Sequence, residues 1–267
     1  RTKAALRRIP VVGEAMVHGV EQVKEDLKRL YLRDGALFEE MGITYYGPVN
    51  GHDLGELDAF LRMAKEAAKP VLLHVITEKG HGCDYCTDDY DGLWHGVGAF
   101  DAQSGRQTAA GGTTQGKAVS RMVTELAAED ERIYAITPAM TTGAHLTEFA
   151  KKYPKRFIDA GIAEEHALVL ANALALDGMR PFVTIYSTFL QRGYDEVNHD
   201  IARMGGNVVV GIDRCGVIGE DGVSHQGIFD VSLLLPVPGI ILAQGRDAAE
   251  SARLLTTGFT AEGPYFL

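Results

Sequence analysis

From residue 115 to the end of the chain, short apolar runs alternate with segments whose apolar residues recur at helical spacing. Strands are predicted for the apolar runs, at Ile133–Ile136, Arg156–Ile158, Phe182–Ile185, Val208–Ile212 and Ile240–Leu242. Helices are predicted between them, at Lys117–Ala128, Leu146–Lys152, Glu164–Leu176, Phe189–Met204, Gln226–Leu234 and Ala248–Thr257. This alternation predicts an α/β fold with a doubly wound parallel sheet.

The first part of the chain is patterned less regularly. Residues 1–31 are basic, and apolar residues at helical spacing predict a helix in their second half. Gly47–His52 is predicted as a turn-rich loop, and Asp53 as the N-cap of a helix that runs to about Ala67. Val71–Ile76 is predicted as a buried strand, so these residues form one helix-then-strand unit of an α/β layer.

Residues 79–116 show no periodicity and are rich in Gly, Asp and Thr. A connection of about 35 residues is too long for an ordinary loop inside a compact domain. We therefore predict a loop that carries part of a site, followed by a linker between domains.

Length and charge narrow the choice of function. The chain has 267 residues and a net charge of −10, which argues against binding nucleic acid or an anionic membrane as the main role. No apolar run approaches the ~20 residues of a membrane span. Three cysteines cannot form a disulfide framework, so we predict a reducing cytoplasm. The ends, Arg1 and Leu267, suggest a piece of a longer protein.

Three polar segments directly follow predicted strands, and together they form the candidate site. They are Gly161–Ala167 with Glu164, Tyr186–Arg192, and Asp213–Gly227 with Arg214, Asp221 and His225. The carboxyl ends of parallel strands are where such sheets bind ligands. Each segment also has an ordinary structural interpretation: an acidic first helical turn, packing at a helix start, and a capped turn.

The chemistry of these residues suits a flat, charged ligand. A carboxylate such as Glu164 can share a proton with a ligand nitrogen, and an aromatic ring at a strand end can stack on a heterocycle. Arg192 could bind a phosphate or a carboxylate with its planar fork of donors.

Two other patterns are set aside. His81–Cys86 contains C-x-x-C beside a histidine, but zinc needs a second ligand pair that the chain does not obviously offer. This pattern therefore favours neither zinc nor redox chemistry. Asp34-Gly35 and Asp221-Gly222 echo a Gly-Asp-Gly metal motif without its first glycine or its later Asn.

Several segments resemble the 1-deoxy-D-xylulose-5-phosphate synthase family, which is transketolase-like. The resemblance covers nearly the whole chain, and its most specific parts are Tyr186–Arg192 and the loop from Arg214 to His225. The segments that carry it are Leu37–Ile43, Tyr46–Asp53, Trp94–Gly98, Ala135–Met140, Gly161–Ala167, Ile185–Arg192 and Ile212–Gly227.

The resemblance implies an enzyme that depends on thiamine diphosphate and Mg²⁺. It would join pyruvate and D-glyceraldehyde 3-phosphate into 1-deoxy-D-xylulose 5-phosphate and carbon dioxide, as a cytoplasmic homodimer. It places residues 1–100 at the end of a first domain, residues 101–116 in a linker, and residues 117–267 in a second domain that binds the pyrimidine. The fold implied is of the thiamine diphosphate-binding type.

The resemblance also implies roles around the cofactor. Glu164 would hydrogen-bond the pyrimidine ring nitrogen, Phe189 would stack on the ring, and Ile162 would also contact the cofactor. Arg192 lies near this pocket without an assigned role.

Substrate roles follow in the same way. Tyr186 and Arg214 would hold the phosphate of the aldehyde. Asp221, His225 and His95 would contact substrates and intermediates or move protons. No metal ligand is expected within this chain, because the diphosphate and Mg²⁺ motif of the family would lie in a segment upstream.

Departures from the family leave two alternatives open. Lys79–Cys83, Ala163–His166, Asn50 and Cys215 differ from the usual family residues. The third domain and a further phosphate-binding arginine would lie beyond Leu267. The chain could be the pyrimidine half of a split enzyme, or a non-catalytic binding module that keeps the fold. By itself it is expected to be inactive in each case.

Overall fold

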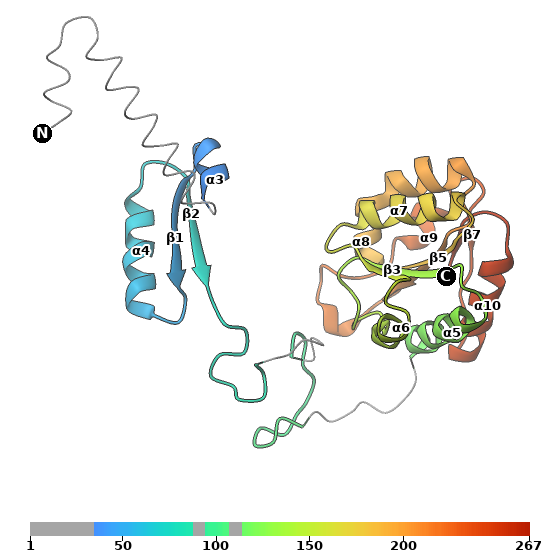
Figure 1. Cartoon of the computed structure of the whole chain (residues 1–267), viewed down its shortest axis with the longest axis horizontal. Coiled ribbons are helices and arrows are strands. Elements are labelled where there is room, and N and C mark those ends of the chain that lie inside the picture. The colour runs from blue at the N-terminus through green and yellow to red at the C-terminus, as the bar shows by residue number, and fades with distance from the viewer. Residues whose placement is uncertain (1–34, 88–93, 107–113) are drawn as a thin grey trace, which may run out of the picture. The chain divides into compact units, whose positions relative to one another are not determined.

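The structure is a computed structural model that describes residues 35–87, 94–106 and 114–267. The helix predicted within residues 1–31 lies outside the described residues. The chain divides into two compact units, residues 1–89 and 90–267 (Figure 1). Within the described part, no helix has the length and apolar character needed to cross a membrane.

The N-terminal unit contains two parallel strands, β1 (Thr44–Asn50) and β2 (Val71–Ile76), with the helices α3 (Ala36–Glu40) and α4 (Leu54–Glu66). As predicted, Asp53 caps α4: its carboxylate accepts hydrogen bonds from the backbone N–H groups of Gly55 and Glu56 at 2.9 and 3.0 Å. The strand predicted at Val71–Ile76 is also confirmed, but its predicted burial is wrong, because five of its residues are half-buried and Ile76 is exposed.

The prediction of a loop at Gly47–His52 is wrong over its first four residues. β1 continues through Gly47 and Pro48 to Asn50, and its register with β2 shifts between Tyr46 and Val49. Gly47 has a φ of +130°, and a Cβ there would lie 2.6 Å from the carbonyl oxygen of His74. Turn-forming residues therefore mark an irregularity inside a strand rather than its end.

The structure of the C-x-x-C segment also differs from what its sequence pattern predicted. Cys83 and Cys86 are joined by a disulfide, with their Cα atoms 5.2 Å apart. The pair lies in consecutive turns directly after β2 and not in a metal site.

The C-terminal unit has a six-stranded sheet in the order β4-β3-β5-β6-β8-β7, and every neighbouring pair is parallel. The predicted parallel α/β sheet is confirmed. Its strands are β3 (Ile133–Thr137), β4 (Phe157–Asp159), β5 (Arg180–Tyr186), β6 (Val209–Asp213), β7 (Ile241–Leu242) and β8 (Tyr265–Phe266). The main helices are α5 (Gln115–Glu129), α6 (Thr147–Lys152), α7 (Glu164–Leu176), α9 (Asp230–Leu234) and α10 (Ala248–Thr260).

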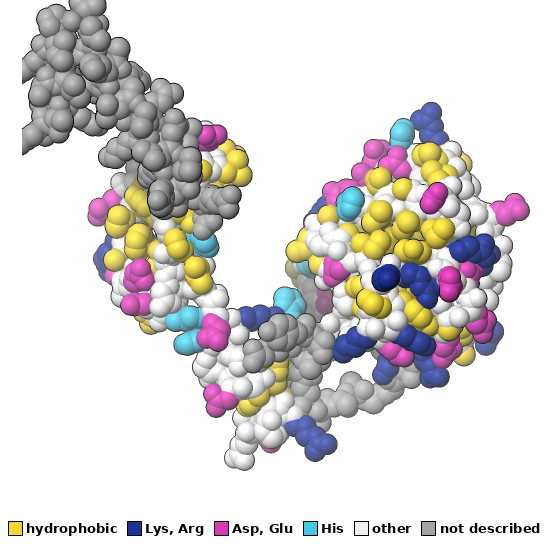
Figure 2. Space-filling model, viewed as in Figure 1, with side chains coloured by type: hydrophobic (Ala, Val, Ile, Leu, Met, Phe, Trp, Pro, Cys, Tyr) yellow, Lys and Arg dark blue, Asp and Glu magenta, His cyan; other side chains and the backbone are white. Residues whose placement is uncertain are grey.

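Helices cover both faces of this sheet (Figure 1). Because successive side chains of a strand point to opposite faces, each strand contributes to two cores. Ile136, Val183 and Val210 pack with α7 and α9, whereas their neighbours Ala135, Phe182 and Val209 pack with α5, α6 and α10. Charged and apolar side chains are mixed on the surface (Figure 2).

The helix predicted over Phe189–Met204 is interrupted. The chain forms α8 (Ser187–Leu190), a 3₁₀ turn η1 (Gln191–Gly193) and a π-helix η2 (Glu196–Ala202). A Cβ at Gly193 would lie 2.5 Å from a methyl carbon of Leu168, so this glycine lets the segment approach α7 closely. Stretches of 3₁₀-helix and π-helix inside a helical segment often mark functional sites.

The helix predicted near Gln226–Leu234 is shorter than expected. Gly227 instead exchanges two backbone hydrogen bonds with Gly216, at 2.7 and 2.8 Å, and α9 begins only at Asp230. This pairing ties the two ends of the loop after β6 together.

The carboxyl edge of the sheet carries the strained backbone. The strand order reverses between β3 and β5, and ligands bind at such switch points outside the carboxyl ends of the strands. Among the described residues, Ala139, His145 and Arg214 are the non-glycine residues with positive φ, at 55° to 57°. Two of them directly follow this edge, since Ala139 comes after β3 and Arg214 after β6, and such strain often accompanies function.

Candidate functional site

Glu164 begins α7 and is a buried carboxylate, with 1% of the residue exposed. Its Oε2 accepts a hydrogen bond from Nη1 of Arg192 at 2.6 Å, which also forms an ion pair. A buried charge is costly unless it is paired, so Arg192 supplies the counter-charge that lets a carboxylate occupy this position.

Arg192 is the residue that sequence reasoning placed near the site without a role. It lies in η1, the tight turn that replaces the middle of the predicted helix, and its side chain is about half exposed. One feature of the sequence pointed to a role for Arg192 in the site: it follows Phe189 by three residues, which places both on one helical turn. The partner could not be identified from spacing because Glu164 belongs to another segment.

Tyr186, at the end of β5, is the centre of a second group of predicted residues. Its hydroxyl donates a hydrogen bond to the carboxylate of Asp221. Its ring lies 4.7 Å from that of Phe189 and 5.8 Å from that of His225, measured between centroids. The rings of Phe189 and His225 meet edge to face at 5.4 Å. Four residues from two of the three predicted segments, Tyr186–Arg192 and Asp213–Gly227, are thus brought together.

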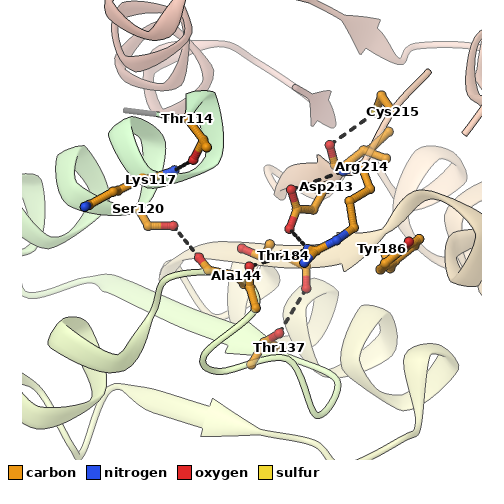
Figure 3. Close-up of polar contacts among 12 residues, drawn as sticks. Thr114, Lys117, Ser120, Thr137, Ala144, Thr184, Tyr186, Asp213, Arg214 and Cys215 are labelled. Atoms are coloured by element: carbon orange, nitrogen blue, oxygen red, sulfur yellow. Dashed lines mark hydrogen bonds and ion pairs between the residues drawn. The ribbon is translucent and has the colours of Figure 1, made fainter. Parts of the chain in front are cut away.

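Arg214 joins this group from the end of β6. Its guanidinium carbon lies 5.1 Å from the centroid of the Tyr186 ring, within the range of a cation–π contact. Nη1 of Arg214 also forms an ion pair with Asp213 at 2.5 Å and donates to the carbonyl oxygen of Gly143 at 3.4 Å. In the view of Figure 3, the Asp213–Arg214 pair lies between Tyr186 and Ala144.

Polar contacts at Ser187, Asp230 and the exposed residue Cys215 support the loop that carries these residues. Ser187 donates to the carboxylate of Asp230 at 2.7 Å, and both residues are buried. The Sγ of Cys215 donates to the carbonyl oxygen of Ile212 at 3.2 Å. Burial of the sulfur, together with nearby Asp230, raises the pKa of the Cys215 thiol to about 12. Cys215 is therefore a neutral thiol at physiological pH.

A cavity of about 1060 Å³ opens at the carboxyl ends of β6, β7 and β8. Its lining includes Asp213, Arg214, Ser120 and His145. Burial lowers the pKa of His145. The volume suits a small-molecule ligand, and Arg214 is the residue that links the cavity to the Tyr186 group.

Two predicted residues lie apart from these groups in the described contacts. Ile162 is 80% exposed, in the loop before α7. His95 is exposed in the segment 94–106, and no contact described for it reaches Tyr186 or His225. Within the described residues, no group of three or more His, Cys, Asp or Glu side chains could hold a metal ion.

The contact between Tyr186 and Asp221 leads to a testable prediction for the pKa of Tyr186. Burial and the hydrogen bond to Asp221 raise the pKa of the Tyr186 phenol to about 12. Asp221→Asn removes a negative charge that disfavours the phenolate, so we expect the pKa of Tyr186 to fall toward the ordinary value of about 10. The measurement is the ultraviolet absorbance of the phenolate against pH, with Tyr186→Phe as the blank.

The matched control for this titration is Asp177→Asn. Asp177 follows the other end of α7, away from the carboxyl edge of the sheet, so its neutralisation should leave the pKa of Tyr186 unchanged. A pKa that stays near 12 in Asp221→Asn would show that Asp221 does not act on the phenol.

Two family models match the chain. Residues 112–267 match the transketolase pyrimidine binding domain, and residues 1–77 match 1-deoxy-D-xylulose-5-phosphate synthase. Among relatives named 1-deoxy-D-xylulose-5-phosphate synthase, the protein of Listeria welshimeri is 45% identical over 263 residues and that of Bacillus velezensis 47% over 262. Each alignment covers 97% of this chain and 41% of the relative, so the chain spans less than half the length of these relatives.

Solved structures give the same fold. A split-gene transketolase described as an inactive β4 tetramer matches with a TM-score of 0.53 and 27% identity, over 58% of this chain and 51% of that one. A transketolase from Leishmania mexicana matches with a TM-score of 0.51 and 20% identity, over 60% of this chain and 25% of that one.

Proposed function

The chain belongs to the transketolase-like family that carries the pyrimidine binding domain, in its 1-deoxy-D-xylulose-5-phosphate synthase branch, and we propose that it supplies the pyrimidine-binding part of a thiamine diphosphate-dependent synthase. The proposed reaction joins pyruvate and D-glyceraldehyde 3-phosphate into 1-deoxy-D-xylulose 5-phosphate and carbon dioxide. The observation that carries this proposal is the buried Glu164 carboxylate, paired with Arg192 at the start of α7.

These residues fit the pyrimidine of the cofactor by their chemistry. A pyrimidine needs a hydrogen-bonding group for its ring nitrogen and apolar contacts for its flat faces. Glu164 offers the carboxylate, Phe189 a half-buried aromatic ring, and Ile162 an exposed apolar side chain. When bound, thiamine diphosphate would supply a nucleophilic carbon that adds to the keto group and a positively charged ring that takes up the electrons released on decarboxylation.

The chain's own residues would act on the cofactor and the substrates in distinct ways. Glu164 would hold a proton at the pyrimidine nitrogen, and Arg192 would keep the carboxylate in place by their ion pair. Arg214 and Tyr186 would bind the phosphate of the aldehyde. Asp221 and His225, which both contact Tyr186, would orient the substrates and move protons.

The N-terminal unit supports the proposal that more protein surrounds this chain in the active enzyme. Among residues 35–87, only Gly35 and Val49 are buried, and β1 and β2 are otherwise half exposed or exposed. A two-stranded sheet needs additional packing to be stable. We propose that residues 1–100 complete a first domain, which holds the diphosphate and Mg²⁺ through residues outside this chain. Residues 101–116 would then be a linker, with residues 117–267 as the second domain.

The remaining implications of the resemblance stay predictions. They are a homodimer, a cytoplasmic location, a role for His95 with the substrates, and the inactivity of this chain by itself.

The test begins with the protein purified from its source. Its intact mass under denaturing conditions is compared with 28.9 kDa, the mass of this chain. The preparation is then incubated with pyruvate, D-glyceraldehyde 3-phosphate, thiamine diphosphate and Mg²⁺. We expect 1-deoxy-D-xylulose 5-phosphate and carbon dioxide in equal amounts. Thiamine diphosphate binding without this product would overturn the proposed substrates.

One solved structure favours a second candidate, a split enzyme. The matching transketolase is described as the product of a split gene and as inactive in its β4 form. A mass near 28.9 kDa, with activity that appears only after a second protein is added, would support this arrangement. If thiamine diphosphate fails to bind even in the complete assembly, the chain is a binding module instead.

A further inference from the structure

The disulfide between Cys83 and Cys86 lies outside every group described above. It closes a turn over Asp84 and Tyr85, in the loop that follows β2. Both cysteines are half-buried, and the two residues between them are exposed. Solvent molecules and small reagents can therefore reach this loop, which is a requirement for reversible thiol chemistry.

Backbone hydrogen bonds hold the two cysteines in one turn alongside the covalent bond. The N–H of Cys83 donates to the carbonyl oxygen of Gly80 at 2.9 Å, and the N–H of Cys86 donates to that of Cys83 at 3.0 Å. The resulting Cα separation of 5.2 Å falls within the range that a disulfide requires. These hydrogen bonds do not involve sulfur, so the dithiol form can keep the same turn.

Gly80 adds a second constraint on this geometry. Its φ is +83°, and a Cβ at this position would lie 2.5 Å from the carbonyl oxygen of Cys86. The chain after the turn therefore folds back directly over Gly80. Glycine fits here for two reasons, its backbone conformation and the lack of space for a side chain.

The start of the loop is anchored to the end of the two-stranded sheet. The rings of His52 and His81 stack with centroids 3.8 Å apart, and Nε2 of His52 accepts a hydrogen bond from the N–H of Glu78 at 2.7 Å. One side of the loop is thus fixed, while Cys83 and Cys86 lie farther along it and flank the exposed residues Asp84 and Tyr85. A thiol freed by reduction remains close to its partner.

The bond is poorly placed to act as a structural staple. The stabilisation by a disulfide grows with the length of the chain it closes, and this one spans a sequence separation of three. It also links no two secondary-structure elements. Its presence is better explained by its chemistry than by its contribution to folding.

We propose that Cys83 and Cys86 form a reversible dithiol–disulfide site that exchanges with small thiols and disulfides of the glutathione type. In oxidation, the thiolate of one cysteine attacks the external disulfide, forms a mixed disulfide and releases one thiol. The second cysteine then attacks the mixed disulfide and releases the other thiol. Two protein thiols are oxidised and one external disulfide is reduced to two thiols, and reduction is the reverse. This inference is independent of the condensation reaction proposed above.

The test equilibrates the native full chain in buffers with a series of ratios of reduced to oxidised glutathione. Free thiols are then trapped with an alkylating reagent, and the alkylated residues are identified by peptide mass spectrometry. We expect Cys83 and Cys86 to change together from nearly complete alkylation in reduced buffer to at least a tenfold loss in oxidised buffer. Two outcomes would overturn the proposal: equal alkylation in all buffers, or a disulfide that is reduced only after unfolding.

Single variants separate intramolecular exchange from ordinary thiol oxidation. In Cys83→Ser and in Cys86→Ser, the remaining cysteine cannot resolve the mixed disulfide, so each variant should keep one glutathione per chain. The unsubstituted chain should keep none at this site. Retention of glutathione by the unsubstituted chain at either cysteine would contradict the proposed pair.

Cys215 is the internal control in every sample. The raised pKa of its thiol, about 12, keeps it protonated and slow to react. Its alkylation should be low and independent of the glutathione ratio. If Cys215 followed the same redox curve, the change would reflect general oxidation rather than a site at Cys83 and Cys86, and the proposal would fail.

Discussion

Glu164→Gln is expected to lower kcat of the proposed synthase by about 10²- to 10⁴-fold, the usual contribution of a positioned proton-transfer group. Glutamine has nearly the same shape, and its amide oxygen can still accept the hydrogen bond from Arg192. It carries no charge and cannot hold a proton for the pyrimidine nitrogen. The substitution therefore tests the proton-holding role rather than packing, and the measurement is steady-state product formation in an active preparation.

Glu165→Gln is the matched control for this prediction. Glu165 neighbours Glu164 in the first turn of α7, but it is only half-buried. Its neutralisation should leave kcat within about twofold of the starting protein, if proton transfer through Glu164 contributes the orders of magnitude expected of it. Thermal unfolding of both variants checks that each remains folded. A near-normal kcat in Glu164→Gln would refute the catalytic role of this carboxylate and the assignment of function that rests on it.

The sheet of the C-terminal unit could be predicted because its signals are local. Strand β5 is mostly apolar, with Arg180 at its start and Thr184 as its polar interior residue, and α7 shows its boundaries, Glu164 and Leu176, directly in the sequence. Both are consequences of burial in a sheet that helices cover on both faces, because its strands are then apolar along most of their length. The placement of polar segments at the carboxyl edge follows from the same alternation.

Other features depend on contacts between distant segments and could not be derived from local pattern. The interruption of the predicted Phe189–Met204 helix follows from the close approach of Gly193 to Leu168. The pairing of Arg192 with Glu164 is a further result of that approach. A periodic pattern specifies which face of a helix is apolar, but not where a neighbouring helix forces a tight turn.

The loop around Cys83 shows a different limit of prediction from sequence. C-x-x-C spacing alone is compatible with zinc, with a disulfide or with two free thiols. The choice depends on the backbone, here on the turns that start at Gly80 and bring the two Cα atoms to 5.2 Å. The glycines in this segment were visible in the sequence, but the conformation they allow was not.

Arg214→Met is expected to raise the KM for D-glyceraldehyde 3-phosphate by about 10- to 100-fold. A hydrogen bond to a charged group contributes about 1.5–3 kcal/mol, and each 1.4 kcal/mol corresponds to about a tenfold change in affinity. The side-chain hydrogen bonds described for Arg214 both use Nη1, toward Asp213 and Gly143. The donors on Nε and Nη2 can therefore serve a phosphate while Asp213 keeps the guanidinium in position.

Unphosphorylated D-glyceraldehyde provides the control for this prediction, because it lacks the group that Arg214 would bind. Its KM should be the same for Arg214→Met and for the starting protein, so the variant would lose its preference for the phosphorylated aldehyde. Arg214→Lys keeps the charge but not the planar fork, and its KM should fall between the two. An equal rise in KM for both aldehydes would mean that Arg214 maintains the shape of the site through Tyr186 and Asp213, and does not recognise phosphate.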